Sequence, residues 1–431
     1  MRNRVIPFLA LAVAGLMVAG ATEAEAAGSI FQVVSTPNTE TAPISNDLLT
    51  GASSTSTHDV WAVGFATDPG TTDHTLAEHW NGTKWSVSPT PDGTSGSQLA
   101  AVAAVSPTNA WAVGFQNSAL PIASNTTLIE HWNGSAWSIV PSPNPDTEGD
   151  VLTSVTATSA DDVWAAGYFT TGGGNQILPL FEHWNGTAWS VVQVPAVDSS
   201  VNFVRSINAL SPTNVWAVGY QIDDSSGHSD DLILHWDGTR WTDQPILPIG
   251  QVTLQSVHAV SANDVWAVGT ALGDTGGDSN NLALHWNGSA WTSVKIPNVD
   301  TPSQGSNFME SVTALSSNDV WAVGAATGSA GVNQTMIEHW NGSAWSIVPG
   351  ANEDPQGDNS NTLFSVVATG AGSLTAVGPG AVCSRGTPGR ARSPSRRRTA
   401  ELRGKHSIAT CENGAAGLCV GAGGGCGLFV G

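Results

Sequence analysis

The sequence predicts an all-β fold, a β-propeller of seven four-stranded antiparallel blades. Three observations indicate this fold. Tryptophans recur with a period of about 50 residues, each copy of the pattern holds four short apolar segments separated by turn residues, and no segment has the period of a helix. Four strands per copy at this period are typical of a propeller blade.

The repeat is carried by tryptophan. All 18 tryptophans of the 431-residue chain fall in six copies, three to a copy. The first tryptophans of successive copies are 50, 53, 52, 50 and 55 residues apart. We interpret the tryptophans as packing between blades, because regularly spaced aromatic residues in strands are core by default; stacking against sugars is the alternative. These structural residues are Trp61, Trp80, Trp85, Trp111, Trp132, Trp137, Trp164, Trp184, Trp189, Trp216, Trp236, Trp241, Trp266, Trp286, Trp291, Trp321, Trp340 and Trp345.

Each copy resolves into four strands in order. The first is an apolar alternation such as 152–157, and a tight turn such as 211–214 follows it. The second, third and fourth strands have the patterns VWAVG, LIEHW and AWSIV. Asn-Gly joins the last two and is a strong hairpin signal. A two-residue turn there pairs Trp80 with Thr83 and places Trp80 and Trp85 on one face of the sheet.

The segments outside the six copies complement one another. Residues 31–38 match a fourth strand, and residues 363–378 match a first and a second strand, with Thr375 in the place of tryptophan. We therefore expect a seventh blade, completed by both termini, that closes the ring and leaves no open sheet edge. Its third strand is expected just after Gly378, where the sequence becomes basic and glycine-rich. The last blade is thus incomplete in the repeat pattern.

The segment VWAVG…IEHWNGSAWSIVPSP resembles a kelch repeat, in which an apolar strand ends in two glycines and an aromatic residue and a tryptophan follow in the third and fourth strands. Here a single glycine ends the second strand, as in Gly64-Phe65 and Gly167-Tyr168. The resemblance, to a kelch-like propeller of secreted bacterial type, covers roughly residues 30–378. It implies the architecture and most often a protein-interaction scaffold, but a fold does not define a function.

The beginning of the chain predicts export. Residues 1–27 have the pattern of a secretory signal peptide, with Arg2 and Arg4, an apolar run over 5–20 and small residues before a cleavage site. A membrane anchor is the alternative, but the apolar run is shorter than the ~20 residues that a span needs. We expect residues 28–380 to form a secreted, monomeric propeller with no membrane span after signal cleavage.

Charge separates the propeller from the tail. The whole chain has a formal charge of −21, yet residues 27–380 hold four basic and 31 acidic residues, a charge of −27. Residues 381–431 carry a charge of +6 and all four cysteines. This composition predicts a disordered or frame-shifted tail, with a genuine disulfide-forming basic tail as the alternative. An acidic propeller argues against nucleic acid as a partner.

Binding is expected where the repeats differ. The connections between second and third strands, and those between blades, vary and share one edge of the predicted ring, here called the variable-loop face. Ligands usually bind loops that a rigid scaffold holds. Calcium would suit the acidic loops of this face, but neither has the spacing of a known calcium loop, and a solvated loop is the alternative. The candidate binding residues are Asp223, Asp224, Asp230, Asp231, Asp274 and Asp278.

One histidine recurs in each copy, and a glutamate precedes it in four copies. We interpret both as structural, because successive copies lie in different blades and leucine replaces the glutamate in two copies. We therefore predict no catalytic residue, no metal site and no cofactor. Galactose oxidase-like copper sites do not fit a chain with two tyrosines and no cysteine before Cys383, and sialidase-type sites need more arginines. These residues are His79, His131, His183, His235, His285 and His339, with Glu78, Glu130, Glu182 and Glu338.

Together these features predict a secreted, non-enzymatic recognition module. It would bind extracellular carbohydrate or a cell-envelope polymer through the variable-loop face. One alternative is an extracellular protein-protein interaction scaffold, and another is a propeller hydrolase or lyase, which no acid, base or nucleophile constellation supports. The expected partner is an extracellular glycan or protein, and the sequence does not identify which.

Overall fold

A computed structural model describes the propeller repeats. The chain divides into two compact units, Met1–Thr387 and Pro388–Gly431, and every described residue belongs to the first. The predicted signal peptide and the tail beyond residue 385 lie outside the described residues. Those described are 31–34, 36–37, 46–67, 72–93, 96–117, 124–146, 148–194, 199–244, 246, 249–272, 279–299, 306–327, 333–350, 361–378 and 381–385.

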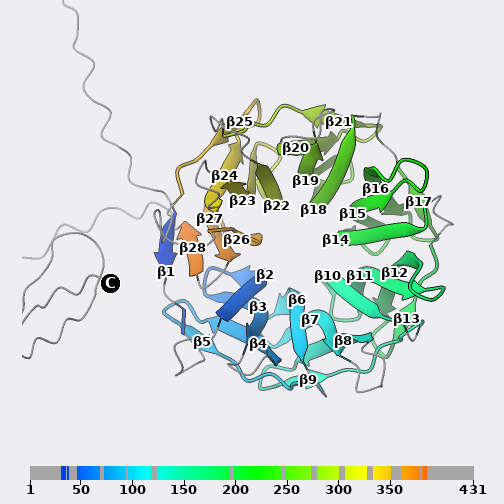
Figure 1. Ribbon diagram of the computed structural model, residues 1–431. Coiled ribbons are helices and arrows are strands. Elements are labelled where there is room, and N and C mark those ends of the chain that lie inside the picture. Colours follow the sequence, from blue (N-terminus) through cyan, green and yellow to red (C-terminus); the bar gives the residue numbers. More distant parts are fainter. Residues whose placement is uncertain are drawn as a thin grey trace, which may run out of the picture. The chain divides into compact units, whose positions relative to one another are not determined.

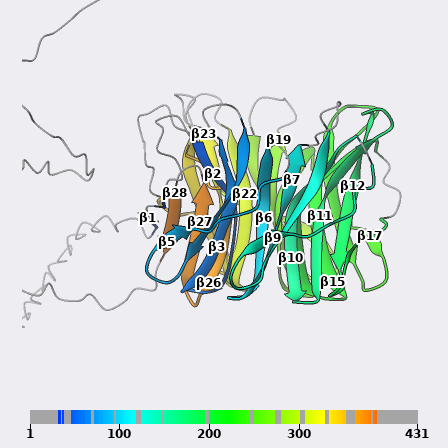
Figure 2. The ribbon, with the colours of Figure 1, turned by 90° about the horizontal axis from the view of Figure 1, so that it is seen from below.

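This part of the chain is an all-β propeller. Within the described ranges there are strands and turns and no helix. The strands form sheets around a common axis (Figure 1), and in side view they run roughly along it (Figure 2). The architecture follows from the repeat, because each copy alternates apolar segments with hairpin turns and so builds an antiparallel sheet that needs neighbours on both faces.

Each repeat has an inner strand near the axis and a second strand beside it, which together form its longest hairpin. The inner strands are β2 (Asn46–Ser56), β6 (Ser97–Ser106), β10 (Asp150–Ser159), β14 (Val201–Ser211), β18 (Gln251–Ser261), β22 (Asn307–Ser316) and β26 (Ser365–Gly370). The second strands are β3 (Asp59–Thr67), β7 (Asn109–Asn117), β11 (Asp162–Thr171), β15 (Asn214–Ile222), β19 (Asp264–Leu272), β23 (Asp319–Thr327) and β27 (Ser373–Gly378).

A third strand and a short outer strand complete the sheets. The third strands are β4 (Asp73–Trp80), β8 (Asn125–Trp132), β12 (Gln176–Trp184), β16 (Ser229–Trp236), β20 (Ser279–Trp286), β24 (Asn333–Trp340) and β28 (Ala381–Arg385). The outer strands are β5 (Trp85–Val87), β9 (Trp137–Ile139), β13 (Trp189–Val191), β17 (Trp241–Asp243), β21 (Trp291–Val294), β25 (Trp345–Ile347) and β1 (Gln32–Val34).

The number of hydrogen-bonded sheets differs from the seven separate blades that the sequence predicts. Among the described residues there are six sheets, five of four strands and one of eight. The eight-stranded sheet arises because β12 and β14 form one parallel bridge, Ile177 to Val201. Asn202 fastens the junction, since its side-chain amide donates to the carbonyl oxygen of Ile177 at 3.2 Å. A local contact between two repeats thus merges their sheets.

One sheet combines the two ends of the propeller region. Its order is β1-β28-β27-β26, so an N-terminal strand pairs with three C-terminal strands. β28 begins shortly after Gly378, where the split repeat predicts a third strand, and pairs antiparallel with both β27 and β1. The complementary fragments of the sequence therefore meet in one sheet.

The hairpin between third and outer strands has a different register from the predicted one. Trp80 lies directly opposite Trp85, not Thr83. The turn is longer because the side-chain oxygen of Asn81 accepts hydrogen bonds from the backbone N–H groups of Thr83 and Lys84 at 3.0 and 3.1 Å. This Asn-centred turn recurs in the other copies, with Asp237 in one of them.

Second-strand tryptophans are buried between adjacent repeats. The ring of Trp61 lies 5.0 Å from those of Trp132 and Trp137 in the next repeat. Trp321, the last of the series, packs instead against Phe31 at 5.7 Å. Phe31 directly precedes β1 and occupies the place of an outer-strand tryptophan. The other second-strand tryptophans that make the same contact are Trp111, Trp164, Trp216 and Trp266.

The other two tryptophans of each copy flank these contacts. Outer-strand tryptophans are buried, and third-strand tryptophans are half-buried. The indole N–H of Trp80, for example, donates to the carbonyl oxygen of Thr57 at 3.1 Å. The outer-strand set is Trp85, Trp137, Trp189, Trp241, Trp291 and Trp345, and the third-strand set is Trp80, Trp132, Trp184, Trp236, Trp286 and Trp340.

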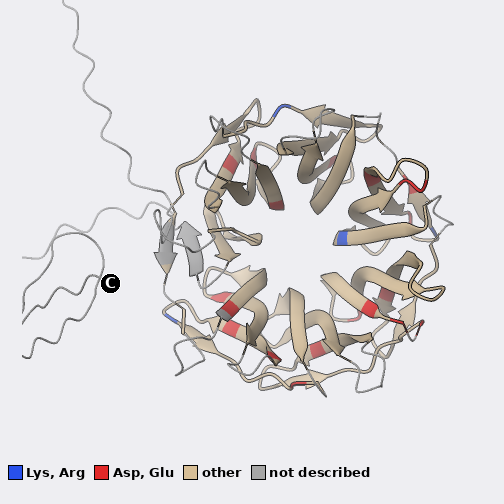
Figure 3. Cartoon of the chain, viewed as in Figure 1, with Lys and Arg blue, Asp and Glu red and all other residues tan. Residues whose placement is uncertain are grey.

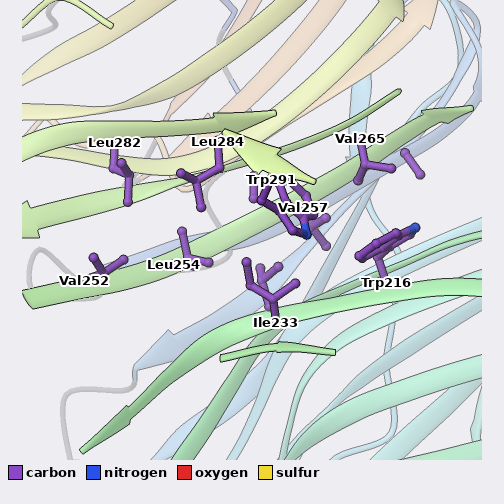
Figure 4. Packing of buried hydrophobic residues seen from close by; sticks show 12 residues of the cluster. Trp216, Ile233, Val252, Leu254, Val257, Val265, Leu282, Leu284 and Trp291 are labelled. Carbon is purple, nitrogen blue, oxygen red and sulfur yellow. The ribbon is translucent and has the colours of Figure 1, made fainter. Parts of the chain in front are cut away.

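The core is a series of clusters between neighbouring sheets. Figure 4 shows one of them, in which Trp216 and Ile233 of one repeat pack against Val257, Leu284 and Trp291 of the next. Similar clusters recur between the other repeats. Burial of apolar area between sheets therefore holds the propeller together and leaves the inner strands to face the axis.

Candidate functional site: an axial cavity

The inner strands share a β-bulge at one level. In six of them the register shifts by one residue a few positions after the strand begins. A bulged residue leaves the regular pairing, so its side chain is aimed differently from its neighbours. The residues at this level, which we call the bulge positions, are Thr50, Ala100, Thr153, Arg205, Gln255 and Glu310, with Phe364 at the equivalent place before β26.

These positions converge on one cavity. All seven inner strands or the residues next to them line a space of about 320 Å³ on the axis. Among the described residues that line it, Arg205 and Glu310 are the only charged ones. In Figure 3 basic residues are rare around the whole ring, and one lies on β14 at its inside. The cavity therefore contains an isolated cation within an acidic propeller.

A belt of serine hydroxyls surrounds the cavity. Ser154, Ser206, Ser256 and Ser311 each accept a hydrogen bond, at 3.1 to 3.2 Å, from a backbone N–H of the next inner strand. Ser365 makes the same bond to the N–H of Ala52, at 3.2 Å, and so joins the last repeat to the first. These bonds fix the spacing of the inner strands and hence the shape of the cavity.

Arg205 is held in one orientation. Its Nε donates to the side-chain oxygen of Gln255 at 2.9 Å. No described residue forms a hydrogen bond or salt bridge with its two Nη atoms. In contrast, the hydroxyls of Thr50 and Thr153 donate to backbone carbonyl oxygens of the next strands at 2.9 and 2.8 Å. The Nη edge of Arg205 therefore has no partner among the described residues, while Gln255 restrains the guanidinium through Nε.

Glu310 lies near Arg205 on the next inner strand but one. Burial raises the pKa of Glu310, and the positive charge of Arg205 opposes that rise. The two groups thus interact electrostatically without a direct ion pair among the described contacts. The carboxyl of Glu310 lowers the net charge of the cavity when it is ionised.

An aromatic row lies between Arg205 and the variable-loop face. Phe203 precedes Arg205 by two residues on β14, and its ring lies 5.0 Å from that of Tyr168 and 5.1 Å from that of Tyr220. These are the only two tyrosines of the chain. Burial raises the pKa of Tyr168, and the charge of Arg205 lowers it. The charge of Arg205 therefore reaches Tyr168, although the three aromatic residues are outside the lining of the cavity.

The predicted aspartates of the variable-loop face have local roles. Asp223 accepts hydrogen bonds from Ser225 and Ser226 within its own turn, and these bonds lower its pKa to about 2. Asp224 accepts from the hydroxyl of Ser200 at 2.5 Å. The bonds of Asp223 close the turn between β15 and β16, and the bond of Asp224 joins this connection to Ser200, which directly precedes β14.

The remaining predicted aspartates are on or near β16 and in a second loop. Asp230 and Asp231 begin that strand, and Asp231 accepts from the backbone N–H of Ile246 at 3.3 Å. Burial raises the pKa of Asp231 to about 6. Asp274 and Asp278 lie outside the described residues. No group of three acidic, histidine or cysteine residues suited to a metal ion occurs in the described ranges.

The repeated histidines are engaged within their own repeats. His79 stacks on Trp61 with ring centroids 4.4 Å apart, and its Nε2 lies 2.6 Å from Asp59. The glutamates beside the histidines are at most 1 % exposed. Both sets belong to the packing between blades and lie away from the residues that line the cavity.

Sequence reasoning missed Arg205, Gln255 and Glu310. They occupy one column of the repeat, between a column of leucine, valine or methionine and a column of glycine, alanine or serine. In successive repeats this column holds threonine, alanine, threonine, arginine, glutamine, glutamate and phenylalanine. That variability within a repeated strand is the signal in the sequence that indicates these residues.

Comparisons with known proteins agree on the architecture. No protein-family model matches the sequence, and no curated protein matches it significantly. The structure of YCF48 bound to D1 peptide has a TM-score of 0.51 at 13 % identity, over 83 % of this chain and 97 % of that chain. The WD40 β-propeller domain of Doa1 has a TM-score of 0.51 at 10 % identity, over 85 % and 100 %.

A carbohydrate-active propeller is also similar. The GH74 xyloglucanase from Xanthomonas campestris has a TM-score of 0.51 at 10 % identity, over 82 % of this chain and 53 % of that chain. At such identities the likeness shows the fold alone, and the protein is a β-propeller of repeated blades. The kelch resemblance continues to rest on the repeat pattern. The described residues contain no helix that is long and apolar enough to cross a membrane.

Proposed function

We propose that this protein is a secreted, non-enzymatic recognition module that binds an extracellular carbohydrate or cell-envelope polymer from its variable-loop face. The observation that carries the proposal is the axial cavity, to which each of the seven inner strands or the residue before it contributes a side chain, six of them at a shared bulge. A rigid scaffold with a variable, concave centre is typical of a binding site. Loops around the mouth would add contacts to the ligand chain.

The test is affinity electrophoresis of the full-length secreted protein in gels that contain neutral or acidic polysaccharides. We expect retardation by at least one polysaccharide and no release of reducing ends from it. Unchanged mobility in every gel would contradict carbohydrate binding. Steady release of reducing ends by the purified protein would contradict the non-enzymatic part of the proposal.

A protein-interaction scaffold is the second candidate. The kelch-like pattern favours it, and a similar propeller, YCF48, has been solved with a bound peptide. Capture of one defined extracellular protein, together with no retardation by any polysaccharide, would favour the scaffold over the carbohydrate module. Both candidates use the same variable-loop face.

We also propose that the ring has seven blades and is closed by both termini. The eight-stranded sheet then counts as two blades, because a single bridge joins its halves. Two observations support closure: the hydrogen bond from Ala52 to Ser365, and the packing of Val377 with Leu49 and Trp85 of the first repeat. In a closed ring the inner edge strands surround the axis and the outer edge strands, such as β5, are short, which suits a monomer.

A further inference from the structure

We propose that the axial cavity binds the carboxylate of a uronic-acid residue, with Arg205 as its ion partner. This inference rests on the proposed function and names the ligand class of that site. Arg205 is an exposed residue of the cavity lining, so an anion in the cavity can reach its guanidinium.

The hydrogen bonding of Arg205 favours a carboxylate as its ligand. Gln255 fixes the guanidinium through Nε, while the Nη edge has no hydrogen-bond or ion-pair partner among the described residues. A guanidinium with an open edge binds a carboxylate through two parallel hydrogen bonds, which are stronger than bonds between neutral groups. Because the bond to Gln255 already restrains the guanidinium, less side-chain entropy is lost when the anion binds.

The surroundings of Arg205 favour one isolated negative charge. Residues 27–380 carry a formal charge of −27, and Glu310 lies beside Arg205. A ligand with many closely spaced charges would be repelled by this field. A single carboxylate on an otherwise hydroxylated ligand would meet the one cation of the cavity with less repulsion.

The remaining polar groups suit a sugar. The hydroxyls of Ser206, Ser256 and Ser311 accept backbone N–H groups, and each retains its own O–H to donate. The volume of about 320 Å³ is at the lower end for ligand pockets, ~300–1,000 Å³, and fits one sugar residue.

Isothermal titration of the full-length protein tests this assignment. The probes are methyl glucuronoside, which carries a single carboxylate, and its methyl ester, which removes the charge and keeps the sugar. We expect the acid to bind at least about tenfold more tightly than the ester, because the ester loses the charge-assisted pair. Arg205→Ala should weaken binding of the acid by about tenfold or more, and Arg205→Lys should restore only part of it.

Matched controls separate this role from folding. Arg240 is the other described arginine with a described side chain; it lies on an exposed hairpin turn, so Arg240→Ala should leave the affinity unchanged. Glu310→Gln should tighten binding of the acid by about threefold, because it removes a nearby like charge. Arg205 is exposed, so its substitution should leave the protein folded. The melting temperature of each variant checks this.

Each outcome decides between the proposals. Equal binding of acid and ester, or unchanged affinity in Arg205→Ala, would overturn the uronate assignment and leave the carbohydrate module standing. Absence of binding to either probe, with retardation by neutral polysaccharides, would do the same. Absence of binding to every polysaccharide would overturn both proposals together.

Discussion

At the scale of single residues, the repeated chemistry is a tryptophan, a histidine and a polar partner. In four copies the histidine Nε2 faces an aspartate, as in His183 and Asp162 at 2.6 Å. In two copies an asparagine takes that place, at 3.1 Å from His131 and 3.0 Å from His235. Burial lowers the pKa of both these histidines, and a neutral amide cannot offset that effect as a carboxylate does.

Replacement of this amide by a carboxylate should change the titration of one histidine. In Asn109→Asp the new charge lies next to Nε2 of His131 and favours the imidazolium, so the pKa of His131 should rise. NMR titration of the histidine ring protons measures it, and His235 in the same protein is the internal control, because its partner Asn214 is unchanged. An unaltered titration of His131 would contradict the role assigned to the partner.

Residue identities show what the sequence could predict and what it could not. Tryptophan at a fixed period predicted the sheets, since large aromatic rings at strand spacing need a partner surface. Arg205 could not be found in the same way, because its importance depends on a bulge. A bulge is a property of two paired strands, and neither strand alone reveals it. The turn at Asn81 shows the same limit, where a side chain altered the register.

At the scale of elements, the bulge explains the single glycine of each second strand. The sequence pattern predicted that this glycine ends the strand, but in the six complete copies the strand continues past it, as β15 does from Gly219 to Ile222. A Cβ added to Gly219 would lie 1.8 Å from the carbonyl oxygen of Phe203 on the facing inner strand. The equivalent glycines of the other five complete copies would meet backbone atoms at 1.8 to 2.1 Å. Close approach of the two backbones is therefore part of the geometry that directs the bulge residue, Arg205, to the axis.

A methyl group at this point should disturb both stability and the cavity. We expect Gly219→Ala to lower the free energy of unfolding by about 1–3 kcal/mol, the usual range for overpacking, because the clash is with rigid backbone. Chemical denaturation measures the loss. Gly350→Ala is the control, since its added Cβ would meet only side-chain atoms at 2.9 Å or more, and those can shift. Equal stability of the two variants would argue against the constraint.

At the scale of the whole molecule, the proposed closure of the ring would depend on a few residues at the N-terminal edge. Phe31 is 1 % exposed and lies in a cluster with Trp321, Ile337 and Leu374. If the ring is closed by β1, Phe31→Ala should destabilise the entire propeller by about 3–5 kcal/mol, as for other buried phenylalanines. Phe181 is equally buried but lies far from both chain ends, so Phe181→Ala shows the full loss of stability expected for a buried phenylalanine. A large effect at Phe181 with none at Phe31 would show that closure does not depend on β1.

The stability of the whole molecule should also depend on pH. Four buried glutamates recur between blades, and burial raises the pKa of each to about 8; they are Glu78, Glu130, Glu182 and Glu338. Burial also raises the pKa of Asp150 to about 7. The histidines with lowered pKa values, His131, His235 and His258, act in the opposite direction, but only below their ordinary pKa of about 6.5.

Stability should therefore fall as pH rises from 6.5 to about 8. In this window the unfolded carboxyls are ionised while the folded ones keep their protons, so unfolding releases protons and becomes more favourable at higher pH. The contribution is complete below the unfolded pKa of about 4.5 and is lost as pH passes the folded value of about 8. Scanning calorimetry from pH 6.5 to 8.5 should show a decreasing melting temperature. Glu182→Gln should make the decrease shallower, because glutamine cannot ionise, and a melting temperature that instead rises across this range would show that these carboxyls are charged inside the fold.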